Sequence, residues 1–186
     1  KNLIRDYYDG LLVFEVSKRN AWDPAETDTL GIEKYFKKHK KDYKWDIPRF
    51  KGFIIHTSDE SLIKEVKKLL KKYEHKNWNA ELKKRYTDGK KLKASAVYNI
   101  WKEGDNKIVD KYIFDKPDIK IAENKARPYV GLQGRILKKG PEELADVRAQ
   151  VVSDYQDYKE KEWLNKLRAA SKIEVFDDVV KTVNNH

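Results

Sequence analysis

The sequence contains no cysteine, no methionine and no long apolar run. Without cysteine there can be no disulfide framework, no thiol nucleophile and no Cys-ligated zinc site. No segment approaches the roughly 20 consecutive apolar residues that a membrane helix needs, and the mean hydropathy is −0.90. We therefore expect a soluble globular protein without a membrane span. Because the chain begins at Lys1 and lacks methionine, we also expect it to be a processed or trimmed piece.

Motifs for metal, cofactor or nucleotide chemistry are also missing. There is no H-E-x-x-H, no P-loop and no G-x-G-x-x-G. The acidic pairs Glu142/Glu143 and Asp177/Asp178 stand at predicted helix openings, where the helix dipole favours acids, so we interpret them as structural. We expect neither a metal site nor a cofactor. The four histidines are scattered over separate predicted elements: His39, His56, His75 and His186.

Charge is abundant and unevenly distributed. The 186 residues include 41 Lys and Arg against 31 Asp and Glu, which gives a net charge of +10. Residues 34–93 alone carry 20 basic and 8 acidic residues, a net charge of +12. Lysines at helical spacing usually form a solvated helix face, and this interpretation is favoured. Nucleic-acid binding by the basic 34–93 block is the alternative, although we regard nucleic acid as an unlikely partner.

Apolar residues recur at three- and four-residue steps, which predicts amphipathic helices. Pro141, followed by two acids, is typical of the first turn of a helix. The first and last long helices each lack another apolar partner, so we expect them to pack together. The predicted helices span residues 6–20, 29–41, 62–73, 78–86 and 141–170, with a final turn at 178–183.

Strands are predicted at residues 49–56, 93–101 and 129–137, where β-branched and aromatic residues cluster or alternate between turn signals. Residues 108–114 fit either a short helix or a third strand. Ile173, Val175 and Phe176 suggest a short strand or an extended end. The pattern predicts an α+β fold in which a small, antiparallel-containing sheet with helices is inserted between the N- and C-terminal helices.

Residues 29–140 resemble a parvulin domain, the fold of one family of peptidyl-prolyl cis-trans isomerases. Residues 30–43 resemble its entry helix, residues 48–55 its first strand, and residues 78–89 its F-x-x-L-A-x-x-Y-S-x-D helix. The tail, with Lys-Glu-Trp-Leu-Asn-Lys-Leu at 161–167, resembles the closing segment of SurA/PrsA-type foldases. The resemblance implies a helical chaperone-type module at 1–46 and 141–186, and a degenerate parvulin-like domain at 47–140.

The sequence departs from parvulins where catalysis would take place. Members of that family resemble one another in carrying two strand histidines beside an apolar proline pocket. The alignment puts Gly52 at the first histidine and residues 133–135 (Gln-Gly-Arg) at the second. His56 lies four residues after Gly52, about 13 Å further along the strand at roughly 3.3 Å per residue, too far to substitute. We therefore assign no catalytic residue, and whether the chain is an enzyme stays open.

Three aromatic residues are candidates for a peptide-binding groove: Tyr98, Trp101 and Phe114. Ordinary core packing is an equally good interpretation of them. The resemblance implies a periplasmic foldase-type chaperone that binds unfolded outer-membrane or secreted polypeptides. The missing histidines predict that this domain has no isomerase activity. An active prolyl isomerase is a further alternative, and it requires a different strand register.

Overall fold

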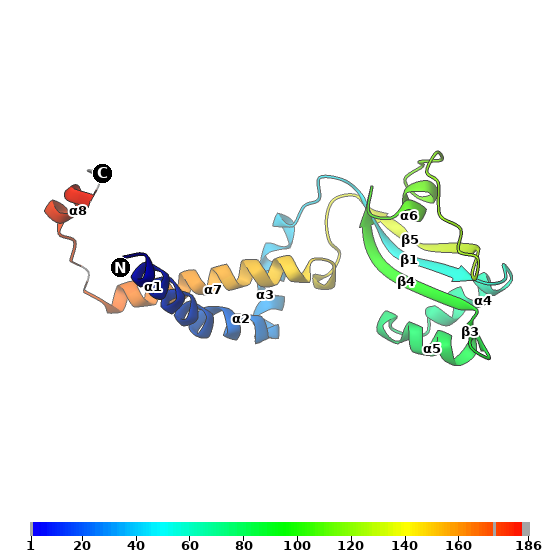
Figure 1. Cartoon of the computed structure of the whole chain (residues 1–186), viewed down its shortest axis with the longest axis horizontal. Helices are drawn as coiled ribbons and strands as arrows, with labels where there is room; N and C mark the ends of the chain where they lie inside the picture. Colours follow the sequence, from blue (N-terminus) through cyan, green and yellow to red (C-terminus); the bar gives the residue numbers. More distant parts are fainter. Residues whose placement is uncertain (1, 173, 184–186) are drawn as a thin grey trace. The chain divides into compact units, whose positions relative to one another are not determined.

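The computed structural model describes residues 2–172 and 174–183 and has the predicted α+β fold (Figure 1). The chain divides into two compact units. Unit 1 comprises residues 1–42 and 142–186, and unit 2 comprises Tyr43–Pro141. The sequence placed the two boundaries at 46/47 and 140/141. That unit 1 is a chaperone module and unit 2 a degenerate parvulin domain stays a prediction.

Unit 2 is built on a three-stranded antiparallel sheet in the order β4-β1-β5. The central strand β1 (Arg49–Thr57) pairs along its whole length with β4 (Ala94–Lys102) and with β5 (Tyr129–Leu137). All three strands confirm the sequence prediction to within one residue at each end. A two-residue hairpin, β2 (Thr87–Asp88) with β3 (Lys91–Leu92), forms a separate small sheet.

Both faces of β1 are buried, because successive side chains of a strand point to opposite faces and each face is covered. Helices α4 (Leu62–Leu70) and α5 (Trp78–Arg85) cover one face, and α6 (Lys107–Tyr112) covers the other. We call the first set of residues the α4/α5 cluster: Phe53, Ile55, Val66, Leu70, Trp78, Leu82, Ala94 and Ala96. The second set is the α6 cluster: Phe50, Ile54, Trp101, Ile108 and Val109.

The segment that the sequence left open, residues 108–114, is helical rather than a strand: α6 ends at Tyr112, and Ile113 and Phe114 follow it as a turn and a bend. Asn106 caps α6 by accepting hydrogen bonds from the backbone N–H groups of Ile108 (2.9 Å) and Val109 (3.2 Å). This cap satisfies donors that have no partner inside the helix, and it starts a helical turn where a strand would have needed a neighbouring strand. The cap therefore places Ile108 and Val109 against the sheet.

Unit 1 is helical. Helix α1 (Asn2–Ser17) continues through a π-helical turn (Lys18–Trp22) into α2 (Asp23–Thr27), and α3 (Thr29–His39) follows. The long helix α7 (Arg148–Ala170) returns and packs against the π-helical turn, α2 and α3. Trp22 links the N-terminal helices to α7 by two hydrogen bonds. Its Nε1 donates to the Glu160 carboxylate (3.1 Å), and its carbonyl accepts from the Gln156 side chain (3.3 Å). The predicted packing of the opening helical segment on the closing helix is confirmed here.

The predicted start of the closing helix at Pro141 is wrong. A 3₁₀ turn (Leu144–Asp146) comes first, and α7 begins at Arg148. The carboxylate of Asp146 accepts hydrogen bonds from the backbone N–H groups of Glu142 and Glu143. The acids therefore cap a short turn rather than occupy the first turn of the long helix.

The end of the chain also differs from the prediction. Asp177–Val183 form the short helix α8 rather than a single turn. Val175 and Phe176 precede that helix without strand pairing. Ile173, which the sequence joined to them in an extended segment, lies outside the described residues.

Candidate functional site

The structure does not bring the three predicted groove residues together. Tyr98 and Trp101 lie on opposite faces of β4, as an odd sequence separation requires. Tyr98 packs against the α4/α5 cluster and stacks on the His75 ring, with centroids 4.8 Å apart. Trp101 belongs to the α6 cluster, where only 5% of it is exposed. A groove on one face of the sheet therefore cannot include both Tyr98 and Trp101.

Trp101 and Phe114, in contrast, do share one cluster. Trp101 stacks on Phe50 with centroids 6.0 Å apart, and Phe114 packs against the same buried residues. Partly buried apolar residues of the segment after α6 and of β5 complete this packing. The face of the sheet that resembles the parvulin catalytic face is thus filled by its own side chains. A peptide-binding role for these aromatic residues stays a prediction.

The sequence alignment with parvulins puts Gly52 at the first histidine and residues 133–135 at the second, and two glycines meet at this place in the sheet. Gly52 of β1 pairs directly with Gly134 of β5. A Cβ built on Gly52 would overlap the Gln133 carbonyl oxygen and would stand 2.7 Å from Gly134 Cα and 2.8 Å from Phe50 Cζ. A Cβ on Gly134 would overlap the Lys51 carbonyl oxygen and meet the Phe50 ring at 2.6 Å. Because backbone atoms form this contact, neither position accepts a side chain without moving a strand.

His56 does not replace the missing histidines. It lies near the end of β1, opposite Ser95 and Val130. Burial lowers the pKa of His56. A hydrogen bond with the Arg127 backbone opposes this shift in part, and the positive charge of Arg127 lowers the pKa further. Its Nδ1 is buried without a hydrogen-bond partner. A neutral, partly enclosed imidazole at this place fits a structural position better than a proton-transfer role.

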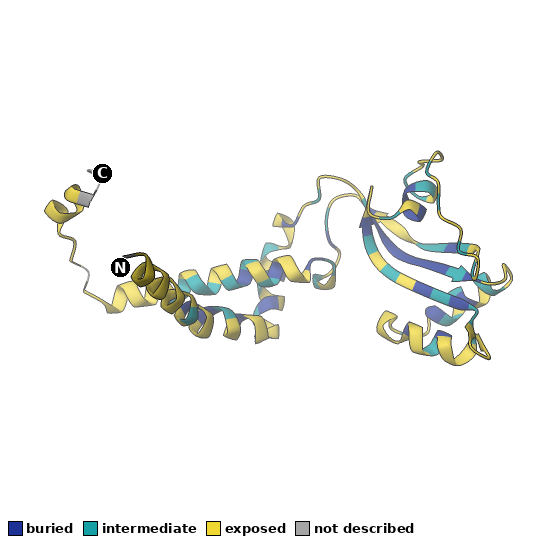
Figure 2. Ribbon diagram, in the orientation of Figure 1, coloured by how far each residue is buried: buried dark blue, intermediate teal, exposed yellow. Residues whose placement is uncertain are grey.

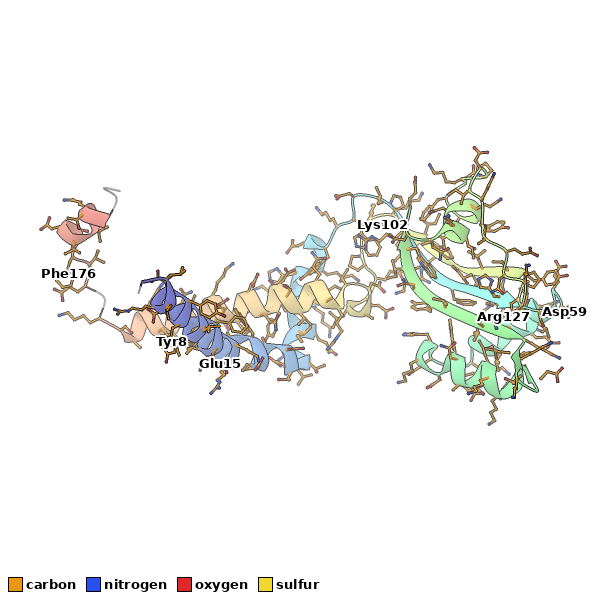
Figure 3. The ribbon with its side chains drawn as sticks, viewed as in Figure 1. Tyr8, Glu15, Asp59, Lys102, Arg127 and Phe176 are labelled. Atoms are coloured by element: carbon orange, nitrogen blue, oxygen red, sulfur yellow. The ribbon has the colours of Figure 1, made fainter. Side chains whose placement is uncertain are left out.

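The most exposed apolar surface of the described chain lies on α1, where the ribbon is coloured as exposed along its length (Figure 2). Tyr8 and Glu15 mark this helix in Figure 3. Exposures there run from 45% to 82%. Contiguous apolar patches of this kind mark interaction sites on globular proteins. We call the following residues the α1 surface: Leu3, Ile4, Tyr7, Tyr8, Leu11, Leu12, Val13, Phe14 and Val16.

The α1 surface is unusually wide for one helix. At about 100° per residue, its side chains cover more than half of the circumference of the helix. A helix that packs on one neighbour needs an apolar stripe only a little wider than 100°. Ordinary packing begins near the end of α1, where Phe14 meets Trp22 edge-on with centroids 5.4 Å apart. The width of the surface fits a partner that wraps around the helix.

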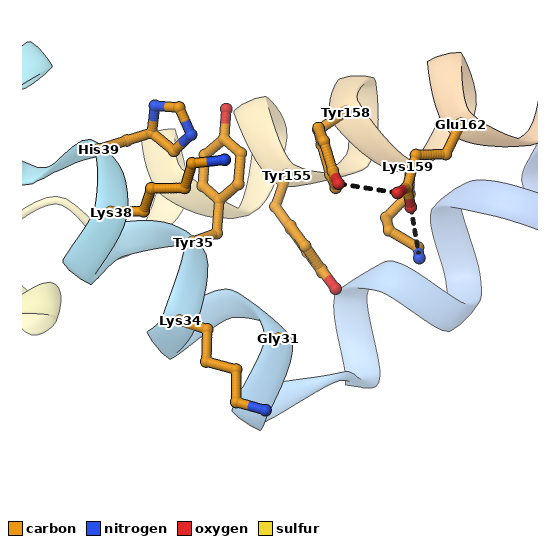
Figure 4. Close-up of a pocket in the computed structure, with 9 residues that line it drawn as sticks. All are labelled: Gly31, Lys34, Tyr35, Lys38, His39, Tyr155, Tyr158, Lys159 and Glu162. Atoms are coloured by element: carbon orange, nitrogen blue, oxygen red, sulfur yellow. Dashed lines mark hydrogen bonds and ion pairs between the residues drawn. The ribbon is translucent and has the colours of Figure 1, made fainter.

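Unit 1 also contains a cavity of about 300 Å³ between α3 and α7, which we call the tyrosine pocket (Figure 4). Tyr35 on α3 faces Tyr155 and Tyr158 on α7, with ring centroids 5.5 and 5.6 Å away. His39 stacks on Tyr35 at 4.4 Å. The volume is at the small end for ligand pockets, so it suits one or two side chains rather than a large cofactor.

Hydrogen bonds hold the two tyrosines of α7 in place. The Tyr155 hydroxyl donates to Asp28 (2.7 Å), and the Tyr158 hydroxyl donates to Glu162 (2.7 Å). Gly31 is required for the first bond, because a Cβ there would overlap both the Asp28 carboxylate and the Tyr155 hydroxyl. The hydroxyls are occupied and their geometry is fixed, which leaves the ring faces as the walls of the pocket.

These bonds also set the protonation of the pocket. Burial and the Asp28 carboxylate raise the pKa of Tyr155 to about 12. The Tyr155 hydroxyl and the Gly31 N–H lower the pKa of Asp28. Lys159 (2.9 Å away) and then Tyr158 lower the pKa of Glu162. At neutral pH both tyrosines are therefore neutral and both acids are ionised.

The part of the chain that the structure describes contains neither a candidate metal site nor a candidate membrane span. No group of three or more His, Asp or Glu residues within residues 2–172 and 174–183 could hold a metal ion. No helix in the same ranges is long and apolar enough to cross a membrane.

No family model and no curated protein matches the chain. Among solved structures, one similar chain comes from work on the virulence factor PEB4 and the periplasmic protein Cj1289, two SurA-like chaperones of the human pathogen Campylobacter jejuni. It is 14% identical, with a TM-score of 0.33, and the match covers 94% of this chain and 74% of that chain. The structural similarity to SurA-like chaperones is therefore distant.

Proposed function

We propose that the chain is a foldase-type chaperone that binds unfolded polypeptide, including outer-membrane or secreted clients, in the periplasm. The α1 surface carries the proposal. It exposes nine large apolar side chains on one helix, and such a surface gains free energy whenever a partner removes it from water. The periplasmic location and the client class rest on the sequence resemblance to SurA/PrsA-type foldases.

An unfolded chain fits the α1 surface better than a single folded partner does. A docked helix or a second copy of α1 would cover one stripe and leave the other apolar side chains in water. An unfolded segment can follow the circumference and place its own aromatic and aliphatic side chains at several points. Such a segment loses conformational entropy on binding, so each contact is weak and many clients can be accepted.

The proposal excludes isomerase activity in unit 2. The close contact between Gly52 and Gly134 leaves no room for a side chain at either glycine, so neither position can carry a group that transfers protons or polarises the amide. The Phe50 ring lies within 2.8 Å of where both side chains would begin, which keeps this part of the sheet closed. Unit 2 is therefore proposed to act as a scaffold or as an additional binding module.

The test is binding of a fluorescently labelled, uncharged synthetic peptide rich in Phe, Leu and Ser, measured by anisotropy at low and high salt. The test variant is Leu11→Gln/Leu12→Gln on α1, which keeps good helix formers. The matched control is Val97→Thr/Ile136→Thr, which changes two exposed apolar residues of unit 2. We expect the α1 variant to lose at least about tenfold in affinity and the control to bind like wild type.

Four results would contradict the proposal. An equal loss of peptide affinity in the α1 variant and in the control would show that the α1 surface is not the specific binding site. Loss only on Tyr98→Ala would move the binding site to the predicted groove. Concentration-dependent dimerisation that is abolished by the α1 variant would make the surface an interface between copies. Salt-sensitive binding of single-stranded DNA, with no peptide binding, would instead favour the basic 34–93 block.

A further inference from the structure

The rim of the tyrosine pocket carries lysine side chains from both of its helices. Lys34 and Lys38 lie one turn apart on α3, on either side of Tyr35 (Figure 4). Among the residues that the structure describes, neither lysine forms an ion pair. The third lysine of the rim, Lys159, is already paired with Glu162. The pocket therefore presents two available ammonium groups beside an aromatic wall.

Among the residues that the structure describes, no acid near the pocket forms an ion pair with Lys34 or Lys38. Burial and then the charges of Asp154, Asp42 and Asp157 raise the pKa of Tyr35, so these acids also lie near the pocket. Glu162 is engaged by Lys159 and by the Tyr158 hydroxyl. Asp28 is engaged by the Tyr155 hydroxyl and the Gly31 N–H. Asp42 pairs with His39 at 3.0 Å. A carboxylate from outside that reaches Lys34 and Lys38 would be their first direct ion-pair partner, and a cationic group at the same place would be repelled by them.

The interior of the pocket selects a second chemical feature. Three tyrosine rings and one imidazole stand with centroids 4.4 to 6.1 Å apart, the spacing of stacked and tilted aromatic pairs. Because two of the three tyrosine hydroxyls are already bonded to acids, these two tyrosines offer a ligand mainly their ring atoms. A planar aromatic side chain is the group that gains most from such a wall.

We propose that the tyrosine pocket binds an aromatic side chain of a client polypeptide whose neighbouring residue carries a carboxylate that pairs with Lys34 and Lys38. This inference rests on the proposed function, since the ligand is taken to be a segment of an unfolded polypeptide. It adds a chemical preference to that function. The α1 surface selects apolar content in general, whereas the tyrosine pocket selects acidic residues next to Phe, Tyr or Trp.

The direct test is an NMR titration of tyrosine ring signals with short capped peptides. Acetyl-Glu-Phe-Glu-amide is expected to shift the signals of Tyr35, Tyr155 and Tyr158. Acetyl-Glu-Ala-Glu-amide lacks the ring and is expected to bind at least about tenfold more weakly. Acetyl-Lys-Phe-Lys-amide carries the opposite charge and is expected to bind more weakly than the uncharged acetyl-Gln-Phe-Gln-amide.

Two variants separate the lysines of the pocket from basic charge in general. Lys34→Gln/Lys38→Gln removes the unpaired ammonium groups at exposed positions, so the fold is expected to persist, as circular dichroism can check. We expect a two- to fivefold loss of affinity for the acidic peptide per lysine, as is typical of exposed ion pairs. Lys64→Gln/Lys68→Gln is the matched control, an exposed pair at the same spacing on α4, and is expected to leave affinity unchanged.

Each outcome can be assigned. Equal binding of the acidic, uncharged and basic peptides, or equal loss in both lysine variants, would overturn the inference. If the uncharged peptide binds the α1 surface but the acidic peptide leaves the tyrosine signals unchanged, the inference is wrong and the proposed function stands. If the acidic peptide binds the pocket but nothing binds α1, the proposed function is wrong as stated and the pocket remains a site for acidic aromatic peptides.

Discussion

The two units handle their apolar side chains in opposite ways. In unit 2, β1 buries nearly every residue between the α4/α5 cluster and the α6 cluster. In unit 1, α7 covers the π-helical turn, α2 and α3, whereas the α1 surface stays in water. Burial stabilises a fold, and exposure leaves free energy available for binding. The contrast indicates that the stability of unit 2 and the binding capacity of unit 1 can be changed separately.

Removing a buried side chain from unit 2 is expected to have the largest effect. Leu82 is 1% exposed in the α4/α5 cluster, so Leu82→Ala should lower the free energy of opening of β1 by about 2–5 kcal/mol. Leu12 on α1 is 47% exposed, and Leu12→Ala should change stability by less than about 0.5 kcal/mol. Native-state hydrogen exchange measures each unit separately. Similar losses in both variants would break the comparison.

Replacing a glycine by alanine adds one methyl group, and its effect on stability is expected to have opposite signs in the two units. Gly52→Ala should destabilise unit 2 by about 1–3 kcal/mol, because the new Cβ meets backbone atoms of β5. Gly10 in α1 has no neighbouring atom within 4 Å of an added Cβ. Gly10→Ala should therefore stabilise α1 by roughly 0.5–1 kcal/mol. Thermal unfolding and helical circular dichroism measure the two effects, and a stable Gly52→Ala protein would refute the close strand contact.

Loss of the α6 cap should have a smaller effect. Asn106→Ala removes the acceptor for two backbone N–H groups and should cost about 1 kcal/mol in unit 2. Asn106→Asp keeps an acceptor and should retain most of that stability. Hydrogen exchange of the amides in α6 reports the change. If the two substitutions behave alike, the cap is not what holds α6 against the sheet.

The smallest effect is confined to alkaline pH and to unit 1. The pKa of Tyr155 is raised from 10 to about 12, so the folded state holds this proton more tightly than the unfolded state does. The resulting stabilisation is complete below pH 10 and is lost as the pH rises towards 12. Several tyrosines have a raised pKa, and Tyr155 has the value of about 12, so the last step in tyrosinate absorbance should disappear in Tyr155→Phe. Tyr158→Phe is the control, and a titration of all tyrosines near pH 10 would contradict the Tyr155–Asp28 bond.

Local patterns predicted most of the secondary structure. The helix at Thr29 and the strands β1, β4 and β5 follow from caps, prolines and apolar spacing, which depend on near neighbours. The helix predicted to begin at Pro141 failed because Asp146 reaches back to two backbone N–H groups and closes a shorter turn. Side-chain competition of this kind is not visible in periodicity.

The candidate site was harder to predict, because it depends on what covers each face. The spacing of apolar residues in α1 can be read from the sequence. The exposure of these residues cannot, because it depends on which residues of the N-terminal segment pack against α7. Tyr98 and Trp101 differ by three positions on a strand, a spacing that already placed them on opposite faces. The tyrosine pocket joins residues more than 100 positions apart. The sequence gives only one indication of this site, the four-residue spacing of pairs within each helix. That spacing places Lys34 with Lys38 on one face of α3, and Tyr158 with Glu162 on one face of α7.

The insertion of unit 2 between the two halves of unit 1 orders events during synthesis. All three strands of unit 2 and its covering helices are synthesised before residues 148–170. Unit 2 can therefore complete its core while α2 and α3 still wait for α7. Until α7 is made, unit 1 is incomplete and its apolar side chains lack their packing partner. During its own synthesis the protein therefore passes through an unfolded state of the kind that we propose it binds in other proteins.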